Sequence, residues 1–409
     1  MTTGGNDATG AADSSIGAVT ESPASQAAFL ARDTVDCLPE GALERKLAEV
    51  RSLRVKLGLD PTAPDVHLGH AVVLRKLREF QDRGHVVVLI IGDYTARVGD
   101  PSGRSSTRPV LSGEEIDANA RTYVEQAATM LDLDRIELRH NSEWLDMRME
   151  ELFALTRTTT VAQLLERDDF AKRYAAREPI SILELLYPLM QAFDSVAVKA
   201  DVELGGTDQR FNLLLGRDVQ RAYGIGEQVA LTMPILAGVD GERKMSKSLG
   251  NHVGVGDAPQ EMYGKTLSLP DEAMPGWYGL LLGEPAPADL SARDAKHALA
   301  RRIVERFHSP AAADAAAEHF DRVFVQHALP EEIEDAEFSV ADGVVHVPAL
   351  IADALGRTRS DARRMLAQGA VKLDGELLGA EDLDLAPARL DGAILRVGKR
   401  EFRRLRRRD

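Results

Sequence analysis

Two histidines that could take part in chemistry stand three residues apart in the stretch DVHLGH, residues 65–70. His67 and His70 open a run with helical periodicity, and residues three apart lie on one face of a helix. The free N–H groups at a helix start favour anions, so imidazoles there would add donors for a phosphate. A zinc pair would need a third protein ligand and usually a spacing of four residues. Phosphate binding, metal binding and a structural role are therefore all open for this pair.

A second candidate stretch is ERKMSKSLGN, residues 242–251, in which two lysines bracket small polar residues ahead of a glycine. Lys244 and Lys247 could hold a triphosphate while its negative charge shifts toward a leaving pyrophosphate. Phosphoryl and nucleotidyl transfers depend chiefly on this kind of electrostatic stabilisation. Alone, the stretch would more simply be an exposed basic loop. It does not stand alone, because the histidine pair is also a candidate phosphate site.

The elements that must position these residues are indicated by hydrophobic patterning. Residues 54–60 are predicted to form a strand, followed by a helix that Asp65 would cap and Gly84 would end. Residues 85–93, HVVVLIIGD, form a continuous β-branched run, which is typical of a strand buried on both faces. A strand, a helix and a strand in so short a span predict a parallel sheet covered by helices. Ligands of such sheets bind beyond the carboxyl ends of the strands, where Gly69 would let a ligand approach the backbone.

Further helices are predicted over residues 42–53, 114–131 and 181–193, with a turn at residues 204–209, LGGTDQ. After about residue 330 the pattern changes to a small mixed module of helix, turn, helix and strand. Residues 393–405 are predicted to form its final strand.

The composition describes a globular chain of two or three domains, with 409 residues, 44% of them hydrophobic and 28% charged. No apolar run approaches the roughly 20 residues that cross a bilayer. The single cysteine, Cys37, excludes an intramolecular disulfide and a multi-cysteine zinc site. Residues 1–30 are rich in Gly, Ala, Ser and Thr and are predicted to be a disordered leader, without the features of a secretory signal.

The charge is unevenly distributed along the chain. The net charge of −15 argues against indiscriminate nucleic-acid binding. Residues 357–409, however, contain 14 Lys or Arg against 9 Asp or Glu. This asymmetry predicts an acidic body with a basic appendage, although a solvated tail would have a similar composition.

HLGH and KMSKS, in this order and about 175 residues apart, resemble the two signature motifs of class I aminoacyl-tRNA synthetases. Together with GDPSGRSSTR (99–108), YPLMQAFDSVAVKADVELGGTDQRFN (187–212) and the C-terminal module, they make the chain similar to tyrosyl-tRNA synthetases. The resemblance runs from about residue 40 to the end, in the bacterial branch with a full KMSKS sequence. It implies an α/β fold whose parts are a leader (1–30), a Rossmann-like catalytic domain with a dimer and tyrosine-binding insert (31–240), the KMSKS loop with a helical anticodon-proximal region (241–335) and an S-four-like RNA-binding domain (336–409).

The resemblance also implies roles for the residues at matching positions. Asp194 would accept the phenol hydrogen bond, and Asp100 and Gln191 would hold the α-ammonium group. The spacing of Tyr187, Gln191 and Asp194 independently places all three on one helix face. The tyrosine site would consist of Thr95, Asp100, Tyr187, Gln191 and Asp194, and the ATP site of Asp60, Gly69, Gly206, Asp208, Gln209 and Lys247. The catalytic set would be Thr62, His67, His70, Arg104, Arg108, Lys244 and Lys247, although both arginines could instead be plain surface residues. The tRNA-binding set would be Arg357, Arg359, Arg363, Arg364 and Lys372.

The sequence departs from the family pattern at Lys56. In the best-known branch, a tyrosine stands two residues before the glycine of the Gly-x-Asp-Pro-Thr element and contacts the substrate hydroxyl. Lys56 occupies that position here. The phenol would then be bound by Asp194 with different help, and the lysine would either pair with Asp194 or point away.

The implied activity is that of a ligase that activates L-tyrosine with ATP and transfers it to the 3′ end of tRNA(Tyr). Mg²⁺ would arrive with ATP, and no structural metal is expected. A cytoplasmic homodimer without membrane association is the family's expectation. The alternatives are a paralogue that activates a tyrosine analogue or serves a biosynthetic or resistance role, and a non-enzymatic RNA-binding protein on the same scaffold. The retained histidines and lysines argue against the non-enzymatic alternative.

Overall fold

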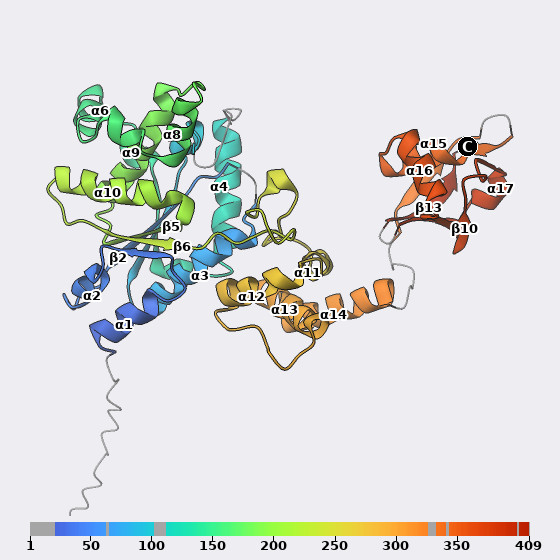
Figure 1. The fold of residues 1–409 in the computed structure, drawn as a ribbon, viewed down its shortest axis with the longest axis horizontal. Helices are drawn as coiled ribbons and strands as arrows, with labels where there is room; N and C mark the ends of the chain where they lie inside the picture. Colours follow the sequence, from blue (N-terminus) through green and yellow to red (C-terminus); the bar gives the residue numbers. More distant parts are fainter. Residues whose placement is uncertain are drawn as a thin grey trace, which may run out of the picture. The chain divides into compact units, whose positions relative to one another are not determined.

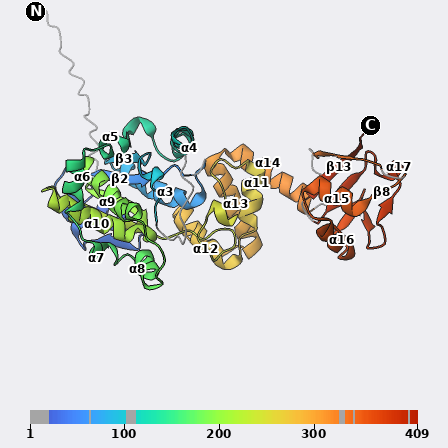
Figure 2. The same ribbon diagram turned by 90° about the horizontal axis from the view of Figure 1, so that it is seen from above.

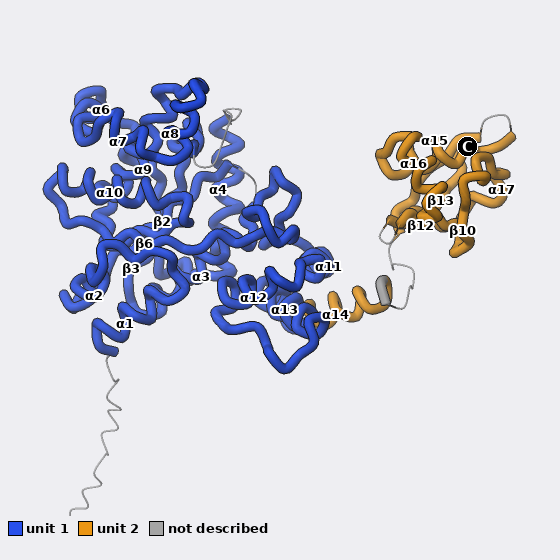
Figure 3. The backbone as a smooth tube through the Cα atoms, viewed as in Figure 1, with its two compact units in different colours: residues 1–310 blue, residues 311–409 orange. Residues whose placement is uncertain are grey.

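The computed structural model describes residues 21–62, 65–101, 112–325, 333–340, 343–398 and 401–408. The candidate catalytic residues Arg104 and Arg108 lie outside these ranges. The chain forms two compact units, residues 1–310 and residues 311–409, which Figure 3 colours separately. The finer division into four parts stays a prediction. No helix within the described ranges combines the length and apolar character that a membrane span needs.

The first unit is built on a six-stranded sheet with the strand order β1-β6-β5-β2-β3-β4. Strands β2 to β6 are parallel, and β1 pairs antiparallel with β6 at one edge. The chain runs from β2 outward to β4 and then returns to the other side of β2, so the strand order reverses between β2 and β5. Ligands of open parallel sheets bind beyond the carboxyl ends of the strands at such a reversal. The strands are β1 (Asp36–Leu38), β2 (Arg54–Leu59), β3 (Val86–Ile91), β4 (Ile136–His140), β5 (Val202–Gly206) and β6 (Val229–Met233).

Helices cover both faces of this sheet, as the predicted α/β class requires. Helix α3 packs on one face, whereas α9 and α10 pack together on the other (Figure 1). Right-handed crossovers that leave the reversal point in opposite directions produce this two-sided cover. Strand β3 is accordingly buried almost throughout. The helices of this layer are α1 (Pro23–Leu30), α2 (Ala42–Leu47), α3 (Leu68–Asp82), α4 (Gly113–Ala127), α9 (Ile182–Ala197) and α10 (Arg210–Ala222).

Two helical segments extend the sheet layer. Short helices fill the connection from β4 to α9, and a second group follows β6 and gathers beside the sheet (Figure 2). The first group comprises α5 (Ser142–Leu145), α6 (Met149–Thr156), α7 (Val161–Leu164) and α8 (Asp168–Ala175). The second comprises α11 (Pro259–Leu267), α12 (Met274–Trp277) and α13 (Ala292–Phe307).

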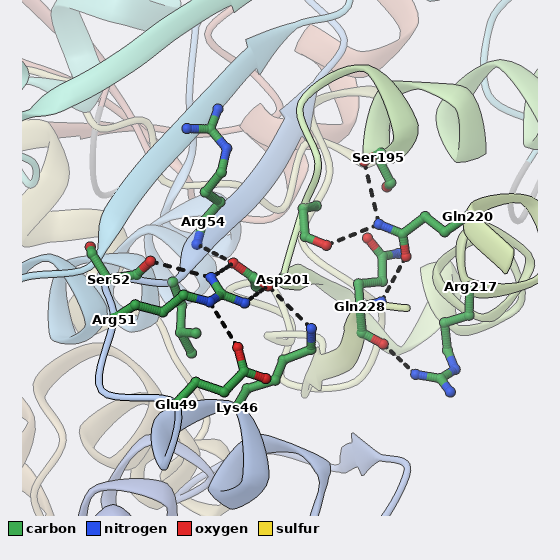
Figure 4. A network of polar contacts seen from close by, with 12 residues as sticks. Lys46, Glu49, Arg51, Ser52, Arg54, Ser195, Asp201, Arg217, Gln220 and Gln228 are labelled. Carbon is green, nitrogen blue, oxygen red and sulfur yellow. Dashed lines mark hydrogen bonds and ion pairs between the residues drawn. The ribbon is translucent and has the colours of Figure 1, made fainter. Parts of the chain in front are cut away.

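The amino ends of β2 and β5 are fixed by a charged network around Asp201 (Figure 4). The Asp201 carboxylate accepts two hydrogen bonds of 2.7 Å from the Arg51 guanidinium and one of 2.9 Å from the Arg54 main chain. The Lys46 ammonium lies 3.1 Å from the same carboxylate. These contacts lower the pKa of Asp201 to about 2 against the opposing effect of its burial. The opposite ends of the same two strands are thereby held in register for the site.

The described part of the chain begins with a helix, so the predicted disordered leader is wrong for residues 23–30. Ser22 caps α1 through its hydroxyl, and Pro23 stands at the first helical position, where its missing N–H costs nothing. Leu30 is completely buried, and the Phe29 ring lies 3.5 Å from the Arg83 guanidinium carbon. These tertiary contacts compensate for a composition that looks disordered.

The second unit contains α14 (Pro310–Phe320) from its second residue onward and a small α+β module. Its five-stranded sheet has the order β10-β9-β12-β13-β7, and a two-stranded sheet pairs β8 with β11. The single final strand predicted over residues 393–405 is instead two antiparallel strands, β12 and β13, and Gly398 follows the first of them at a φ of 63°. The module's elements are β7 (Asp335–Phe338), β8 (Val345–His346), α15 (Val347–Leu355), α16 (Arg359–Ala367), β9 (Val371–Leu373), β10 (Glu376–Leu378), β11 (Asp384–Leu385), α17 (Pro387–Leu390), β12 (Ile394–Val397) and β13 (Glu401–Arg407).

Candidate active site

A cavity of about 620 Å³ opens at the carboxyl ends of β2 and β5, where the strand order reverses. Its walls come from the peptide after β2, the start of α3, the inner face of α9, the turn after β5 and the KMSKS stretch. Every described residue of the predicted tyrosine, ATP and catalytic sets lines it: Asp60, Thr62, His67, Gly69, His70, Thr95, Asp100, Tyr187, Gln191, Asp194, Gly206, Asp208, Gln209, Lys244 and Lys247. The structure thus gathers segments that lie up to 187 residues apart into one site.

Asp194 lies at the buried end of the cavity and is 3% exposed. Its carboxylate accepts a hydrogen bond of 2.8 Å from the Trp144 indole and one of 3.5 Å from the Asn141 amide. Burial raises the pKa of Asp194 to about 7, and nearby Lys56 and these donors oppose the rise. A carboxylate held in this way is a buried hydrogen-bond acceptor.

Tyr187, two turns before Asp194 on the same face of α9, is tied to the end of β2. Its hydroxyl donates to the Asp60 carboxylate at 2.8 Å, and the Thr95 hydroxyl donates to the other oxygen of the same group at 2.7 Å. Burial, with the charge of Asp60 adding to it, raises the pKa of Tyr187 well above its ordinary value. Gly92 makes this approach possible, because a Cβ there would lie 2.0 Å from the Asp60 carboxylate.

Asp100 faces the cavity from the loop after β3. The buried Arg167 guanidinium pairs with one of its oxygens at 3.2 Å, and the Gln209 amide donates to the other at 2.8 Å. The Asn212 side-chain nitrogen donates to the side-chain oxygen of Gln209 at 3.0 Å and to that of Gln191 at 2.8 Å. Asn212 thereby links the two amides. The polar groups along this wall therefore have fixed orientations.

The histidine pair starts helix α3, but the helix is capped differently from the prediction. His67, and not Asp65, is the N-cap, and His70 completes a reciprocal capping box. Nδ1 of His67 accepts from the Gly69 N–H at 3.1 Å, and Nδ1 of His70 accepts from the His67 N–H at 3.2 Å. Gly69 is required here because a Cβ would meet the His67 ring at 2.9 Å.

This capping determines the chemistry that the two imidazoles can offer. Burial lowers the pKa of His67 to about 2 and that of His70 to about 4, with nearby charges such as that of Lys247 adding to the effect. Both rings are therefore neutral at physiological pH, and an accepting Nδ1 leaves the proton on Nε2. Each histidine can offer one N–H donor to a ligand.

The two lysines of the KMSKS stretch line the same cavity. The Lys244 ammonium pairs with Asp208 at 3.2 Å, and the Lys247 ammonium pairs with Asp65 at 3.0 Å. Asp65, predicted as a helix cap, is thus a partner for this loop. The buried Asn251 shapes the loop by accepting from the Ser246 N–H and donating to the carbonyl oxygens of residues 243 and 244.

Lys56 points away from Asp194, toward Glu203. Its ammonium lies 2.9 Å from the Glu203 carboxylate and donates to the Gln191 carbonyl at 2.9 Å and the Ser195 hydroxyl at 2.8 Å. Both side chains of the pair are essentially inaccessible, at 0% and 1%. The residue noted as a departure in the sequence is therefore a buried support for α9.

Several residues around the cavity carry no motif and were missed by the sequence reasoning. Trp144 and Asn141 lie in the connection after β4, Arg167 precedes α8, and Glu203 lies within β5. The glycine after β3, Gly92, was noted only as the end of a strand. The sole local signal was Trp144, one of two tryptophans in the chain.

The predicted tRNA-binding residues lie together on the second unit. Arg359, Arg363 and Arg364 are exposed on α16, Arg357 precedes that helix, and Lys372 is exposed on β9. Arg357 pairs with Glu401 at 2.8 Å and Arg364 with Asp361 at 2.8 Å. Among the described side chains of both units, no group of three or more His, Cys, Asp and Glu could hold a metal ion.

A cavity at the reversal point of a parallel sheet, lined by HLGH at a helix start and by KMSKS, defines a class I aminoacyl-tRNA synthetase. A family model described as tRNA synthetases class I (W and Y) matches residues 48–325. The chain belongs to this family.

Similar proteins place it more narrowly. The tyrosine–tRNA ligase of Moorella thermoacetica is 50% identical over 399 residues, which cover 93% of this chain and 96% of the relative. That of Thermotoga maritima is 48% identical over 395 residues, which cover 94% and 98%. Within the W and Y family, the chain is thus a member of the tyrosyl-tRNA synthetases.

Solved structures share the fold. A C-terminally truncated mitochondrial tyrosyl-tRNA synthetase from Aspergillus nidulans has a TM-score of 0.62 and 24% identity, over 74% of this chain and 94% of that chain. A tyrosyl-tRNA synthetase from Aeropyrum pernix has a TM-score of 0.58 and 22% identity, over 73% and 98%. The predicted Rossmann-like α/β class is confirmed.

Proposed function

We propose that this chain activates L-tyrosine with ATP and transfers the tyrosyl group to the 3′ end of its tRNA, with the cavity residues acting in two groups. The observation that supports this most strongly is one cavity with a buried carboxylate, Asp194, at one end and HLGH and KMSKS at the other. A tyrosine bound between them would direct its carboxylate toward an ATP phosphate.

The buried end binds the amino acid. Asp194 accepts a hydrogen bond from the phenol, and the Gln191 and Asp100 oxygens hold the α-ammonium group with Tyr187 and Thr95 at their sides. Phenylalanine would leave the buried Asp194 without this partner, and a site built in this way can discriminate by about 10⁴ to 10⁵. The orientation of each group is set before substrate arrives, since each already has a protein partner.

The open end binds ATP, with Asp60, Gly206, Asp208 and Gln209 along the ribose and adenine side. The tyrosine carboxylate is ionised at neutral pH and attacks the α-phosphate in line without a general base. The His67 and His70 Nε2–H groups, Thr62 and the α3 amides stabilise the added negative charge, and Lys244 and Lys247 follow the departing pyrophosphate. Mg²⁺ comes with ATP, and Arg104 and Arg108 belong to the same group by their positions in the family motif.

The second unit binds tRNA. Arg359, Arg363 and Lys372 are exposed and have no ion pair among the described residues, so they can meet phosphates without first breaking a protein contact. A ribose hydroxyl of the terminal adenosine of tRNA then attacks the tyrosyl-adenylate and releases AMP.

We further propose a homodimer that works in the cytoplasm, where tRNA is charged. The insert between β4 and α9, together with the start of α9, exposes large apolar side chains that a second copy would cover. These are Met149, Phe153, Val161, Ile182 and Leu183, with Ile182 78% exposed.

ATP–pyrophosphate exchange with a panel of amino acids tests the proposed function. Exchange should depend on L-tyrosine and not on phenylalanine or tryptophan, and tRNA(Tyr) should be charged. Exchange driven equally well by other amino acids, or better by a tyrosine analogue, would contradict the substrate assignment.

A further inference from the structure

A buried ion pair, Lys56–Glu203, lies under the tyrosine end of the cavity. The two residues are direct neighbours in the register of β2 and β5, on either side of the point where the strand order reverses. Isolated charges are expensive to bury, and a buried pair persists only where further hydrogen bonds complete it. The hydrogen bonds that complete this pair are therefore expected to serve the neighbouring substrate site.

The hydrogen bonds around this pair lead directly to the substrate wall. Lys56 bridges two points one turn apart on α9, the Gln191 carbonyl and the Ser195 hydroxyl. Glu203 accepts from the Gln191 amide at 3.1 Å, from the Ser195 hydroxyl at 3.0 Å and from the Gln228 amide. The stretch of α9 between these bonds carries Asp194.

The pair also sets the orientation of the Gln191 side chain. Its Nε2 donates to Glu203, while its Oε1 accepts from Asn212 at 2.8 Å. The remaining lone pair on Oε1 makes Gln191 an acceptor at the cavity wall, which suits an ammonium group. An amide turned by 180° would present a donor there instead.

The charges of the pair act on Asp194 in opposite directions. Lys56 lowers the pKa of Asp194, Glu203 raises it, and burial, the largest influence, raises it as well. The other groups that face Asp194 are the Trp144 and Asn141 donors from the connection after β4 and the Tyr187 ring from α9 itself. Strand β3 contributes apolar Val88 and Ile90 on this side.

We propose that Lys56 is a positioning residue of the tyrosine site: through Glu203, Ser195 and the Gln191 carbonyl it fixes the face of α9 that binds tyrosine, and its charge favours the form of Asp194 that accepts from the phenol. The proposal rests on the proposed function and adds a device to it. In place of a side chain that touches the hydroxyl, the chain uses a buried cation one layer behind the acceptor.

Two isosteric variants separate this role from a merely structural one. Both Lys56→Met and Glu203→Gln break the same ion pair, so a structural role would make their defects alike. The proposal expects opposite effects on the pH dependence of kcat/KM for tyrosine in ATP–pyrophosphate exchange. The acid limb should move to higher pH in Lys56→Met and to lower pH in Glu203→Gln, each by about one pH unit.

The reason for this sign lies in what remains after each change. Without Lys56, the Asp194 carboxylate loses the nearby cation that lowers its pKa, while burial still raises that pKa. Asp194 then takes up a proton at higher pH and loses its function as an acceptor. Without the Glu203 charge, the Asp194 carboxylate loses a group that raises its pKa while Lys56 still lowers that pKa, which favours the ionised carboxylate.

The double variant Lys56→Met/Glu203→Gln completes the test and covers the case in which Lys56→Met does not fold. Replacing a buried ion pair by neutral groups is often neutral for stability, and both opposing charges are removed together. Its acid limb should return to within about half a unit of the wild type. The KM for ATP, measured in the same assays, should change by less than about twofold in all three variants, since that end of the cavity has other contacts.

Equal shifts in one direction, or no shift in either single variant while the wild type depends on tyrosine, would overturn the proposal. A wild type that shows no tyrosine-dependent exchange would instead refute the proposed function, so the two failures are distinguishable.

Discussion

The two ends of the cavity are built in different ways. At the tyrosine end, Asp194 is 3% exposed and its donors come from Trp144 and Asn141, which the fold itself holds in place. At the phosphate end, Lys244 is 50% exposed, and both lysines are paired with carboxylates that a triphosphate would have to replace. Groups that are already fixed, as around Asp194, suit discrimination between amino acids. Lysines that can exchange a carboxylate partner for a phosphate suit the stabilisation of charge that appears only during the reaction.

The largest effect is expected from Asp194→Asn, which removes the anionic acceptor but keeps the side-chain shape. The preference for tyrosine over phenylalanine, measured as a ratio of kcat/KM in ATP–pyrophosphate exchange, should fall about 10²- to 10⁴-fold. Asp208→Asn, a matched change on the ATP side of the cavity, should leave that ratio unaltered. If Asp194→Asn kept the wild-type preference for tyrosine over phenylalanine, Asp194 would not be the group that recognises the phenol hydroxyl.

A smaller effect is expected from neutralising the exposed arginines of α16. Arg359→Gln/Arg363→Gln should raise the KM for tRNA about tenfold and flatten its salt dependence, while tyrosine-dependent exchange stays normal. The control is Arg406→Gln/Arg408→Gln on and after β13, where each arginine already faces an acidic residue of β7 at 3.5 and 3.3 Å. Equal losses in both pairs would point to general charge attraction in place of a defined surface.

The smallest effect is expected from Asp65→Asn. The change releases Lys247 from its 3.0 Å ion pair and removes a negative charge near the phosphates. Because a half-exposed pair of this kind is worth only about 0.2–1 kcal/mol, the KM for ATP should fall about two- to threefold. An unchanged or higher KM for ATP would show that Asp65 does not compete with the triphosphate.

Much of this arrangement could be predicted from the sequence. The β-branched run of β3 identified a buried strand, and the spacing of Tyr187, Gln191 and Asp194 placed them on one helix face because local geometry determines both. The gathering of HLGH and KMSKS into one cavity followed from their family resemblance. These features depend on short-range patterns or on motifs that the sequence carries whole.

The rest depends on contacts between distant parts of the chain. Trp144 reaches Asp194 across 50 residues and Lys56 reaches Glu203 across 147, and neither pairing has a local pattern. The helix cap was mispredicted because Asp65 is a better capping residue than histidine by preference, yet its carboxylate is engaged by Lys247. Residues 23–30 form a helix because side chains far along the sequence pack against it.

The claim that the two ends act separately is tested most directly by Lys247→Ala, with its loop neighbour Arg243→Ala as the control. Stopped-flow measurement gives both the tyrosine Kd and the rate of tyrosyl-adenylate formation. Lys247→Ala should slow adenylate formation about 10²- to 10³-fold and leave the tyrosine Kd within about twofold of the wild type. A tyrosine Kd weakened as strongly as the rate would contradict the division of the cavity into a binding end and a reacting end.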